Sequence, residues 1–347
     1  MAFITVSIVE FIEQIKLFPV LDVRAPTEYT KGHIPGSISF PLLTDEERAK
    51  VGTIYKQNSR QDAIKVGLEI FGPKMRSMVE DVENNILHST SEDNKTVLLH
   101  CWRGGMRSGG VAWLLDFYGF TVITLDGGYK KFRNWVLEQF TKEYDIKILG
   151  GYTGSGKTHI LHEIQKNGLQ VIDLEGLAHH KGSTFGNIGM PEQPSQEMFE
   201  NLLALQLYNA SKTNRTIWIE DESQRLGHVC IPNSLWKQLN TYPTYFLNIP
   251  FEERLDFIVA EYGELDQERL HQAILRIKKR LGGLETTNAI ELLKKGDIKE
   301  SFKILLTYYD KYYAKSFQKK SNTNNLIKIM ECENIDATKN CASLLNI

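Results

Sequence analysis

The feature that most constrains the fold is a glycine-rich segment at residues 151–158. It reads Gly-Tyr-Thr-Gly-Ser-Gly-Lys-Thr and matches the G-x-x-x-x-G-K-[ST] pattern of a P-loop. An apolar strand is expected before it at 146–149 and a helix after it, which is the context that a P-loop requires. The chain must therefore contain an α/β sheet with a phosphate site at the end of one strand.

The residue types of this segment suit a phosphate or diphosphate. Glycines let successive backbone N–H groups face phosphate oxygens, Lys157 adds a mobile cation, and Thr158 can hold a magnesium ion. The candidate phosphate or diphosphate ligands are Gly151, Thr153, Gly154, Ser155, Gly156, Lys157 and Thr158. The strand expected at 216–219 ends in Glu220, Asp221 and Glu222, which are candidates for assisting a metal or the diphosphate. No cofactor is assigned, and Mg²⁺ is compatible with the site.

A second anion site is predicted around Cys101. It follows a buried-looking strand at 96–100 and precedes a helix at 108–118, so glycines, N–H groups and the helix N-terminus converge on its sulfur. Such a field lowers a thiol pKa and favours the nucleophilic thiolate. The predicted catalytic residues are Cys101, Arg103 and Arg107, in an anion loop with Trp102, Gly104, Gly105 and Met106. The spacing H-C-x5-R-S also suits a cysteine phosphatase.

Two α/β patterns follow one another along the chain. Short β-rich runs at 19–23, 96–100 and 121–125 alternate with helical stretches at 8–16, 108–118 and 130–140. They predict a first domain at 1–143 with a mostly parallel sheet and a helical insertion at about 44–89. The second pattern predicts a P-loop α/β domain at 144–347, with a helical C-terminal region at about 251–347.

Charge, cysteine content and hydropathy exclude several classes of protein. Lys and Arg number 41 against 43 Asp and Glu, so any polyanion site must be local. The four cysteines form no C-x-x-C pair, which argues against a zinc ribbon or a disulfide framework. No apolar stretch is long enough for a membrane span, and residues 1–5 do not resemble a secretory signal. We expect a soluble, cytoplasmic chain.

The region before Cys101 carries a first family resemblance. Asp22-Val23-Arg24, Glu28-Tyr29 and the Gly-His-Ile-Pro-Gly-Ser run at 32–37 resemble the rhodanese family of sulfur-transfer domains. In that family the loop cysteine carries a chalcogen as a persulfide. The resemblance implies that Asp22, Arg24, Glu28 and His33 are structural, with an ion pair between Glu28 and Arg24 and a hydrogen-bonded His33.

Joining the two motif sets gives a closer resemblance over nearly the whole chain. A rhodanese-like domain with C-W-R-G-G-M-R-S at 101–108 and a P-loop domain with G-G-x-T-G-S-G-K-T at 150–158 are similar to the tRNA 2-selenouridine synthase family. Further matches lie at 174–183, 185–186, 193–196, 199–201 and 220–223. Lys181 stands where the family has Arg, and Lys cannot form the bidentate fork of Arg.

The resemblance implies a two-step exchange at the wobble uridine of tRNA. The 2-thio sulfur is alkylated by geranyl diphosphate, and the S-geranyl group is then displaced by selenium from selenophosphate. From the residues we infer that the P-loop takes the diphosphate and that the Cys101 loop takes selenophosphate, and we expect the enzyme producing selenophosphate to be a partner. The expected substrate pocket comprises His179, His180, Lys181, Ser183 and Phe185, and the expected groove for the prenyl tail comprises Leu177, Phe185, Ile188, Met190, Phe199 and Leu202.

A basic stretch near the C-terminus is the predicted tRNA surface. Tyrosines at 308, 309, 312 and 313 lie among lysines, and aromatics beside cations suit a nucleic-acid backbone with stacked bases. The candidate residues are Lys278, Lys279, Arg280, Lys311, Lys315, Lys319 and Lys320. The alternative is an ordinary helix whose lysines face solvent and whose tyrosines pack into the core.

Two other classes of function stay open from the sequence. One is a rhodanese-fold cysteine phosphatase or sulfurtransferase fused to a nucleotide-binding module. The other is a non-catalytic binding module, which the intact Cys101, Lys157 and Thr158 disfavour.

Overall fold

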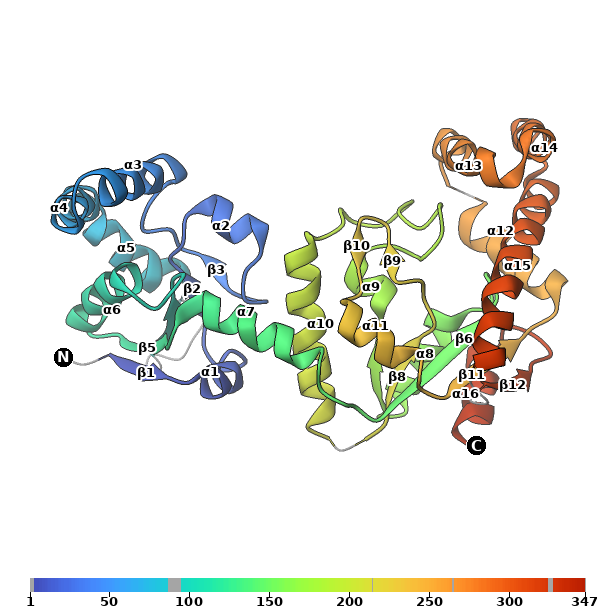
Figure 1. Ribbon diagram of the computed structural model, residues 1–347, viewed down its shortest axis with the longest axis horizontal. Helices are drawn as coiled ribbons and strands as arrows, with labels where there is room; N and C mark the ends of the chain where they lie inside the picture. Colours follow the sequence, from blue (N-terminus) through green and yellow to red (C-terminus); the bar gives the residue numbers. More distant parts are fainter. Residues whose placement is uncertain (1–2, 87–94, 214, 264, 324–326, 347) are drawn as a thin grey trace. The chain divides into compact units, whose positions relative to one another are not determined.

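A computed structural model describes residues 3–86, 95–213, 215–263, 265–323 and 327–346 of the chain (Figure 1). The chain divides into two compact units, residues 1–138 and residues 139–347. Each unit contains one five-stranded sheet in which every pair of neighbouring strands is parallel. The predicted fold class, a parallel α/β domain followed by a P-loop α/β domain, is confirmed.

The sheet of the first unit has the order β1-β5-β4-β2-β3. Its strands are β1 Ile4–Val6, β2 Val20–Asp22, β3 Ile38–Ser39, β4 Thr96–His100 and β5 Thr121–Leu125. Its helices are α1 Ile8–Gln14, α2 Pro26–Lys31, α3 Asp45–Gln57, α4 Arg60–Phe71, α5 Met75–Asp81, α6 Met106–Tyr118 and α7 Gly128–Gln139, with a 3-10 turn at Gly72–Lys74 and a π-helical turn at Val82–Ile86.

Burial explains why β4 holds the centre of this sheet. Its apolar run is paired on both sides, by β2 and β5, and is the kind of continuous apolar strand that parallel sheets bury. One core cluster joins β4 to α4, α5 and α6 through residues such as Phe71, Met78, Leu99 and Val111. β4 therefore delivers Cys101 to the carboxyl edge of the sheet from a rigid base.

The sheet of the second unit has the order β12-β11-β6-β8-β7. The strands are β6 Ile146–Gly151, β7 Gln170–Ile172, β8 Ile217–Glu220, β11 Thr244–Asn248 and β12 Ile327–Glu331, and a separate pair is formed by β9 Arg225–Leu226 and β10 Val229–Cys230. The helices up to β11 are α8 Lys157–Lys166, α9 Leu174–Ala178, α10 Gln196–Ser211 and α11 Asn233–Leu239. The central strand β6 ends at Gly151 and thus begins the P-loop.

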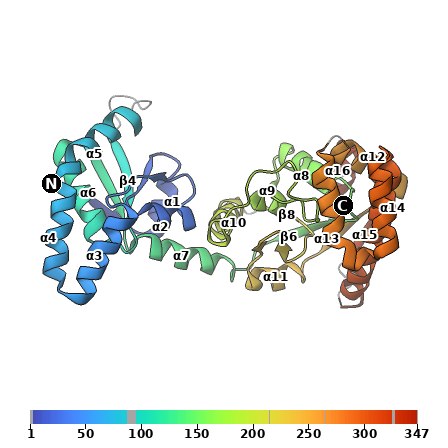
Figure 2. The same ribbon diagram turned by 90° about the horizontal axis from the view of Figure 1, so that it is seen from above.

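Four helices after β11 pack on one another around their own apolar cluster (Figure 2). They are α12 Phe251–Tyr262, α13 Gln267–Leu281, α14 Gly283–Lys294 and α15 Ile298–Thr323, and the chain then forms β12 and α16 Ala337–Leu345. The sequence analysis did not predict β12. It is an edge strand with exposed residues at 328, 329 and 331, so it lacks the continuous apolar run of a central strand.

No helix among the described residues is long and apolar enough to cross a membrane.

Candidate functional site

The Cys101 side chain lies buried at the start of a tight loop between β4 and α6. Its sulfur is 3.1 Å from the Ser108 hydroxyl, which is also buried. Burial alone raises the pKa of this thiol, but hydrogen bonds from Ser108 and from the backbone of Arg103 and Gly105 outweigh it, so the pKa lies below that of an ordinary cysteine. The loop therefore stabilises a thiolate.

A glycine pair after β5 shapes this loop, and the sequence analysis missed it. Gly128 has φ +59°, and a Cβ there would collide with the Cys101 carbonyl and the Gly104 N–H. The next residue, Tyr129, donates its N–H to the Cys101 carbonyl at 2.8 Å. The doublet Gly127-Gly128 directly after a strand was the available signal, because adjacent glycines at a strand end mark a close approach of two backbones.

Replacing Ser108 by alanine is expected to raise the pKa of Cys101. The variant loses the side-chain hydrogen bond that opposes the effect of burial, so less thiolate is present at neutral pH. Iodoacetamide should then alkylate Cys101 several-fold more slowly at pH 7, and the rate should rise at higher pH, as followed by peptide mass spectrometry. Ser77→Ala, which removes an exposed hydroxyl on α5, is the matched control. Identical pH profiles for wild type and Ser108→Ala would contradict this role.

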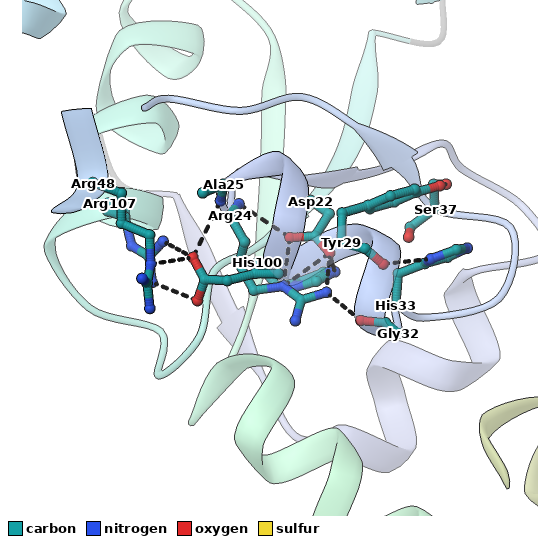
Figure 3. Close-up of polar contacts among 11 residues, drawn as sticks. Asp22, Arg24, Ala25, Tyr29, Gly32, His33, Ser37, Arg48, His100 and Arg107 are labelled. Carbon is teal, nitrogen blue, oxygen red and sulfur yellow. Dashed lines mark hydrogen bonds and ion pairs between the residues drawn. The ribbon is translucent and has the colours of Figure 1, made fainter. Parts of the chain in front are cut away.

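Beneath the cysteine loop lies a buried ion pair between Asp22 and Arg24 (Figure 3). Arg24 Nη2 donates to Asp22 Oδ2 at 2.6 Å and to the Gly32 carbonyl at 2.8 Å. The guanidinium lies 3.7 Å from the centre of the Tyr129 ring. His33 Nδ1 donates to the Tyr29 carbonyl at 3.0 Å, and the His33 ring stacks on the Tyr29 ring, as expected for a hydrogen-bonded structural histidine.

The predicted ion pair between Glu28 and Arg24 is wrong. Arg24 lies two residues after Asp22, so the two side chains leave the extended chain on the same side and pair with each other. Glu28, in the first turn of α2, instead accepts from Arg107 at 2.7 Å and from Arg48 at 2.9 Å (Figure 3). Arg107 is therefore held by a carboxylate, whereas Trp102, Arg103 and Met106 are exposed.

Asp22→Asn is expected to destabilise the first unit by about 3–5 kcal/mol, because it leaves the Arg24 guanidinium buried without its carboxylate. Burial raises the pKa of Asp22, but His100 and Arg24 together hold it below the ordinary value. The stabilisation is therefore present at neutral pH and lost as the pH falls through that lowered pKa, so wild type and variant converge in acid. Hydrogen exchange of peptides covering β2 and β4 measures the difference.

The matched control for this variant is Glu80→Gln, which breaks an exposed pair with Arg76 and should leave the stability nearly unchanged. Equal protection of β2 and β4 in Asp22→Asn and Glu80→Gln would rule out a stabilising role for the buried pair.

The P-loop connects β6 to the N-terminus of α8. Gly156, the residue before α8, has φ +67°, a conformation that side chains with a Cβ rarely adopt. Ser155 is buried, and its hydroxyl has no hydrogen-bond partner among the residues that the structure describes. The Lys157 ammonium lies 3.5 Å from the Gly151 carbonyl and 3.5 Å from a Glu222 oxygen. The loop thus presents a cation, N–H groups and a helix N-terminus together.

Carboxyl groups surround Lys157. Burial lowers the pKa of Lys157, but Glu222, Glu175 and other acids outweigh it and keep the ammonium charged. Burial and the neighbouring Glu222 raise the pKa of Glu175 to about 8. Glu175 accepts from the Thr158 hydroxyl at 3.1 Å, and its N–H donates to Glu220 at 2.7 Å. Glu175 was missing from the predicted site, although it lies in the matched segment at 174–183.

The hydroxyl and carboxyl oxygens around Lys157 fit Mg²⁺, which takes one or two protein ligands and completes its coordination shell with phosphates and water. The Thr158 hydroxyl and the carboxylates of Asp221 and Glu222 line the same cavity and would hold it. Glu220 lies behind Glu175 and is not among the lining residues. Within the described ranges, no group of three or more His, Cys, Asp or Glu side chains could hold a metal by itself.

A cavity of about 1230 Å³ opens beside the P-loop. One end is formed by the P-loop and the carboxyl groups, and the rest has an apolar, aromatic wall from the C-terminal helices. That wall comprises Phe257, Ile258 and Tyr262 of α12, Ile277 of α13, and Phe302, Leu305, Leu306, Tyr308, Tyr309 and Tyr312 of α15. The volume exceeds the roughly 300–1,000 Å³ of a typical small-molecule pocket, so the cavity has room for more than one ligand.

Some residues of the expected substrate pocket and some of the expected prenyl groove line the cavity. His180, Lys181, Ser183 and Phe185 line it, whereas His179 does not and instead contacts the Glu192 carbonyl through Nδ1 at 2.7 Å. Of the six residues expected to contact a prenyl tail, only Phe185 and Met190 are lining residues. The other four, Leu177, Ile188, Phe199 and Leu202, are not among them. The apolar wall comes mainly from helices that the sequence analysis assigned to tRNA binding.

Arg254 of α12 fixes the P-loop to α15. It is buried, donates to the Thr153 carbonyl at 3.1 Å, and forms two hydrogen bonds with Asp310 at 2.9 and 2.7 Å. Tyr313, also on α15, donates to Asp221 at 2.8 Å. The C-terminal helices are thus bonded to both the P-loop and the end of β8.

The candidate tRNA residues lie in the last turn of α13 and along α15. Lys278, Lys279 and Arg280 are exposed in the last turn of α13, and Lys311 is exposed on α15. The Arg280 guanidinium lies 5.7 Å from the centre of the Tyr312 ring, and both residues line the cavity. Lys315, Lys319 and Lys320 belong to α15, but their side chains fall outside the described residues.

The geometry defines a class of protein: a P-loop α/β protein with a rhodanese-like domain that carries a cysteine loop. Residues 7–134 match the Rhodanese-like domain family, and residues 144–335 match the family described as tRNA 2-selenouridine synthase AAA domain. The chain is 32% identical to the tRNA 2-selenouridine synthase of a Sulfurovum species, covering 92% of this chain and 93% of that protein. It is 33% identical to that of Hydrogenovibrio crunogenus, covering 95% and 96%. The chain belongs to the tRNA 2-selenouridine synthase family.

Proposed function

We propose that this chain converts wobble 2-thiouridine in tRNA to 2-selenouridine through an S-geranyl-2-thiouridine intermediate. Geranyl diphosphate and selenophosphate are the co-substrates, which makes the chain a geranyltransferase and a selenotransferase. Family membership supports the overall reaction. The observation that carries the details is a P-loop that opens into an apolar, aromatic cavity, because that combination suits a diphosphate with a hydrocarbon tail.

The first step uses the P-loop. The 2-thio sulfur attacks the first carbon of the geranyl chain, and the carbon–oxygen bond breaks with its electron pair going to the diphosphate. Lys157 and the backbone N–H groups of the loop neutralise the charge that develops on the leaving group. The wall from α12, α13 and α15 holds the tail and keeps water away. When bound, Mg²⁺ would add Lewis-acid assistance to the leaving diphosphate.

The second step uses the cysteine loop. Cys101, with its lowered pKa, attacks the phosphorus of selenophosphate, and the P–Se bond breaks with its electron pair leaving on selenium as selenide. The selenide attacks C2 of the S-geranyl base, the C2–S bond breaks and geranylthiol leaves, and water then hydrolyses the cysteinyl phosphate. Arg103 is exposed beside the loop, and Arg107 is oriented by Glu28, so an incoming anion shares the Arg107 guanidinium with that carboxylate. The same pairing disfavours the alternative of a cysteine phosphatase, in which this arginine would be committed to the phosphoryl oxygens.

In this proposal tRNA binds to the basic last turn of α13 and to Lys311 in the middle of α15. Lys278, Lys279, Arg280 and Lys311 provide charge for the phosphate backbone. Because Arg280 stacks on Tyr312 at the cavity, a backbone bound there brings a nucleoside toward the P-loop. This surface is small and local, as a chain of net charge -2 requires.

Nucleoside analysis of tRNA tests the proposal. Cells lacking this protein should contain no 2-selenouridine, and expression of the wild-type chain should restore it. Purified protein should convert 2-thiouridine in tRNA to the S-geranyl form with geranyl diphosphate alone, and onward only when selenophosphate is added. An unchanged nucleoside profile in the deleted cells would contradict the proposed function.

A further inference from the structure

The alkylation step requires a group that accepts a proton. In 2-thiouridine the C2=S bond adjoins an N3–H. When S2 forms its bond to the prenyl carbon, the C2–N3 bond becomes double and the N3 proton has to leave, so that a neutral S-alkyl base results. Inside a cavity with an apolar wall, a side chain within hydrogen-bond reach is the efficient acceptor.

We propose that His180 takes up the N3 proton. This inference rests on the proposed function, and it assigns a general base within that same cavity. His180 follows α9, is 9% exposed and lines the cavity that contains the P-loop. Its Nδ1 is buried beside Gly186, which is not among the lining residues, and has no hydrogen-bond partner in the described ranges, so the nitrogen that accepts the proton is the other one, Nε2.

His180 lies close to the phosphate end of the cavity through its own chain segment. The Gly182 N–H donates to the His180 carbonyl at 2.9 Å, and the α-carbon of Gly182 packs against the carboxyl groups of Glu222 and Glu175. Glu222 in turn contacts the Lys157 ammonium. A nucleoside that reacts with geranyl diphosphate bound at the P-loop therefore lies near the His180 imidazole.

The groups around the ring favour its neutral form. Burial lowers the pKa of His180, and the positive charge that His228 can carry, on the turn between β9 and β10, lowers it further. On the other side the ring packs against Gly186, which brings no charge. Lys181, the next residue, is paired with Glu261 of α12 at 3.0 Å. A neutral imidazole at physiological pH is ready to accept a proton.

The carboxyl groups of the cavity are less suitable acceptors. Glu175, whose pKa is raised to about 8, already holds a proton at neutral pH and accepts from Thr158. Glu222 contacts the Lys157 ammonium, and Asp221 accepts from the Tyr313 hydroxyl. Two other histidines line the cavity, His159 and His162 of α8, but both are exposed, whereas His180 is buried where water is scarce and a side-chain base is most useful.

The test is single-turnover alkylation of a 2-thiouridine-containing tRNA by geranyl diphosphate, using the full chain. His180→Ala and the more conservative His180→Gln should lower the rate about 10²- to 10⁴-fold without weakening binding of geranyl diphosphate. Added imidazole should restore part of the rate in His180→Ala. Raising the pH should restore it too, because the thiouridine then loses its N3 proton to solvent. The control is His271→Ala, which removes a half-buried histidine of α13 that pairs with Glu268.

Two results would overturn the assignment. One is a rate within about threefold of wild type in both variants, which would move the base to Glu222. The other is a loss that neither imidazole nor higher pH relieves, which would show a merely structural role. Failure of the proposed function would look different, because the wild-type chain itself would then leave 2-thiouridine unalkylated.

Discussion

Lys157→Ala is expected to abolish both products, so that tRNA from cells carrying this variant contains neither S-geranyl-2-thiouridine nor 2-selenouridine. The ammonium lies among the P-loop groups and, in the proposed alkylation, offsets the charge of the departing diphosphate. Loss of one such preorganised group costs about 10²- to 10³-fold in rate. Here the loss is larger, because the carboxylates of Asp221 and Glu222 would repel the diphosphate once their nearby cation is gone.

The matched control is Lys166→Ala, at the other end of α8. Lys166 is exposed and pairs with Glu163, so its removal changes the charge of the chain equally without touching the P-loop. Nucleoside analysis of complemented cells measures both variants. Accumulation of S-geranyl-2-thiouridine in Lys157→Ala cells would assign the diphosphate to another site.

Cys101→Ser is expected to block the second step only. The S-geranyl intermediate should accumulate and 2-selenouridine should disappear, because serine keeps the shape of the buried position but provides no thiolate. Cys230→Ser, at a half-buried cysteine of β10, is the control and should keep the wild-type nucleoside profile. A Cys101→Ser variant that makes normal amounts of 2-selenouridine would remove this cysteine from the chemistry.

The two anion loops could be predicted from sequence because each combines local signals that agree. In both, an apolar strand, a glycine-containing loop and a helix follow within a few residues, and parallel strands of this kind place such loops at one edge of the sheet. The position of Cys101 after β4 and of Lys157 at the start of α8 follow directly. The residue types and their neighbours in the chain were sufficient to predict these two positions.

What the sequence analysis missed depends on contacts between distant segments. Gly128 approaches the Cys101 loop from the end of β5, and only the close packing of two backbones reveals its role. Glu28 was paired with the wrong arginine, because the partner that reaches it, Arg107, is 79 residues away. The tyrosines at 308, 309 and 312 have the same spacing whether they face tRNA or a cavity, and periodicity cannot tell which surface covers them.

The two ends of the large cavity come from segments that are far apart in the chain. The phosphate end depends on residues 151–158, whereas the aromatic wall depends on helices that begin at Phe251. Mutations in those helices can therefore change the length or shape of the apolar wall without altering the residues of the P-loop. Relatives with the same P-loop but different side chains at Phe302, Leu305 and Leu306 would be expected to prefer alkyl donors of a different size.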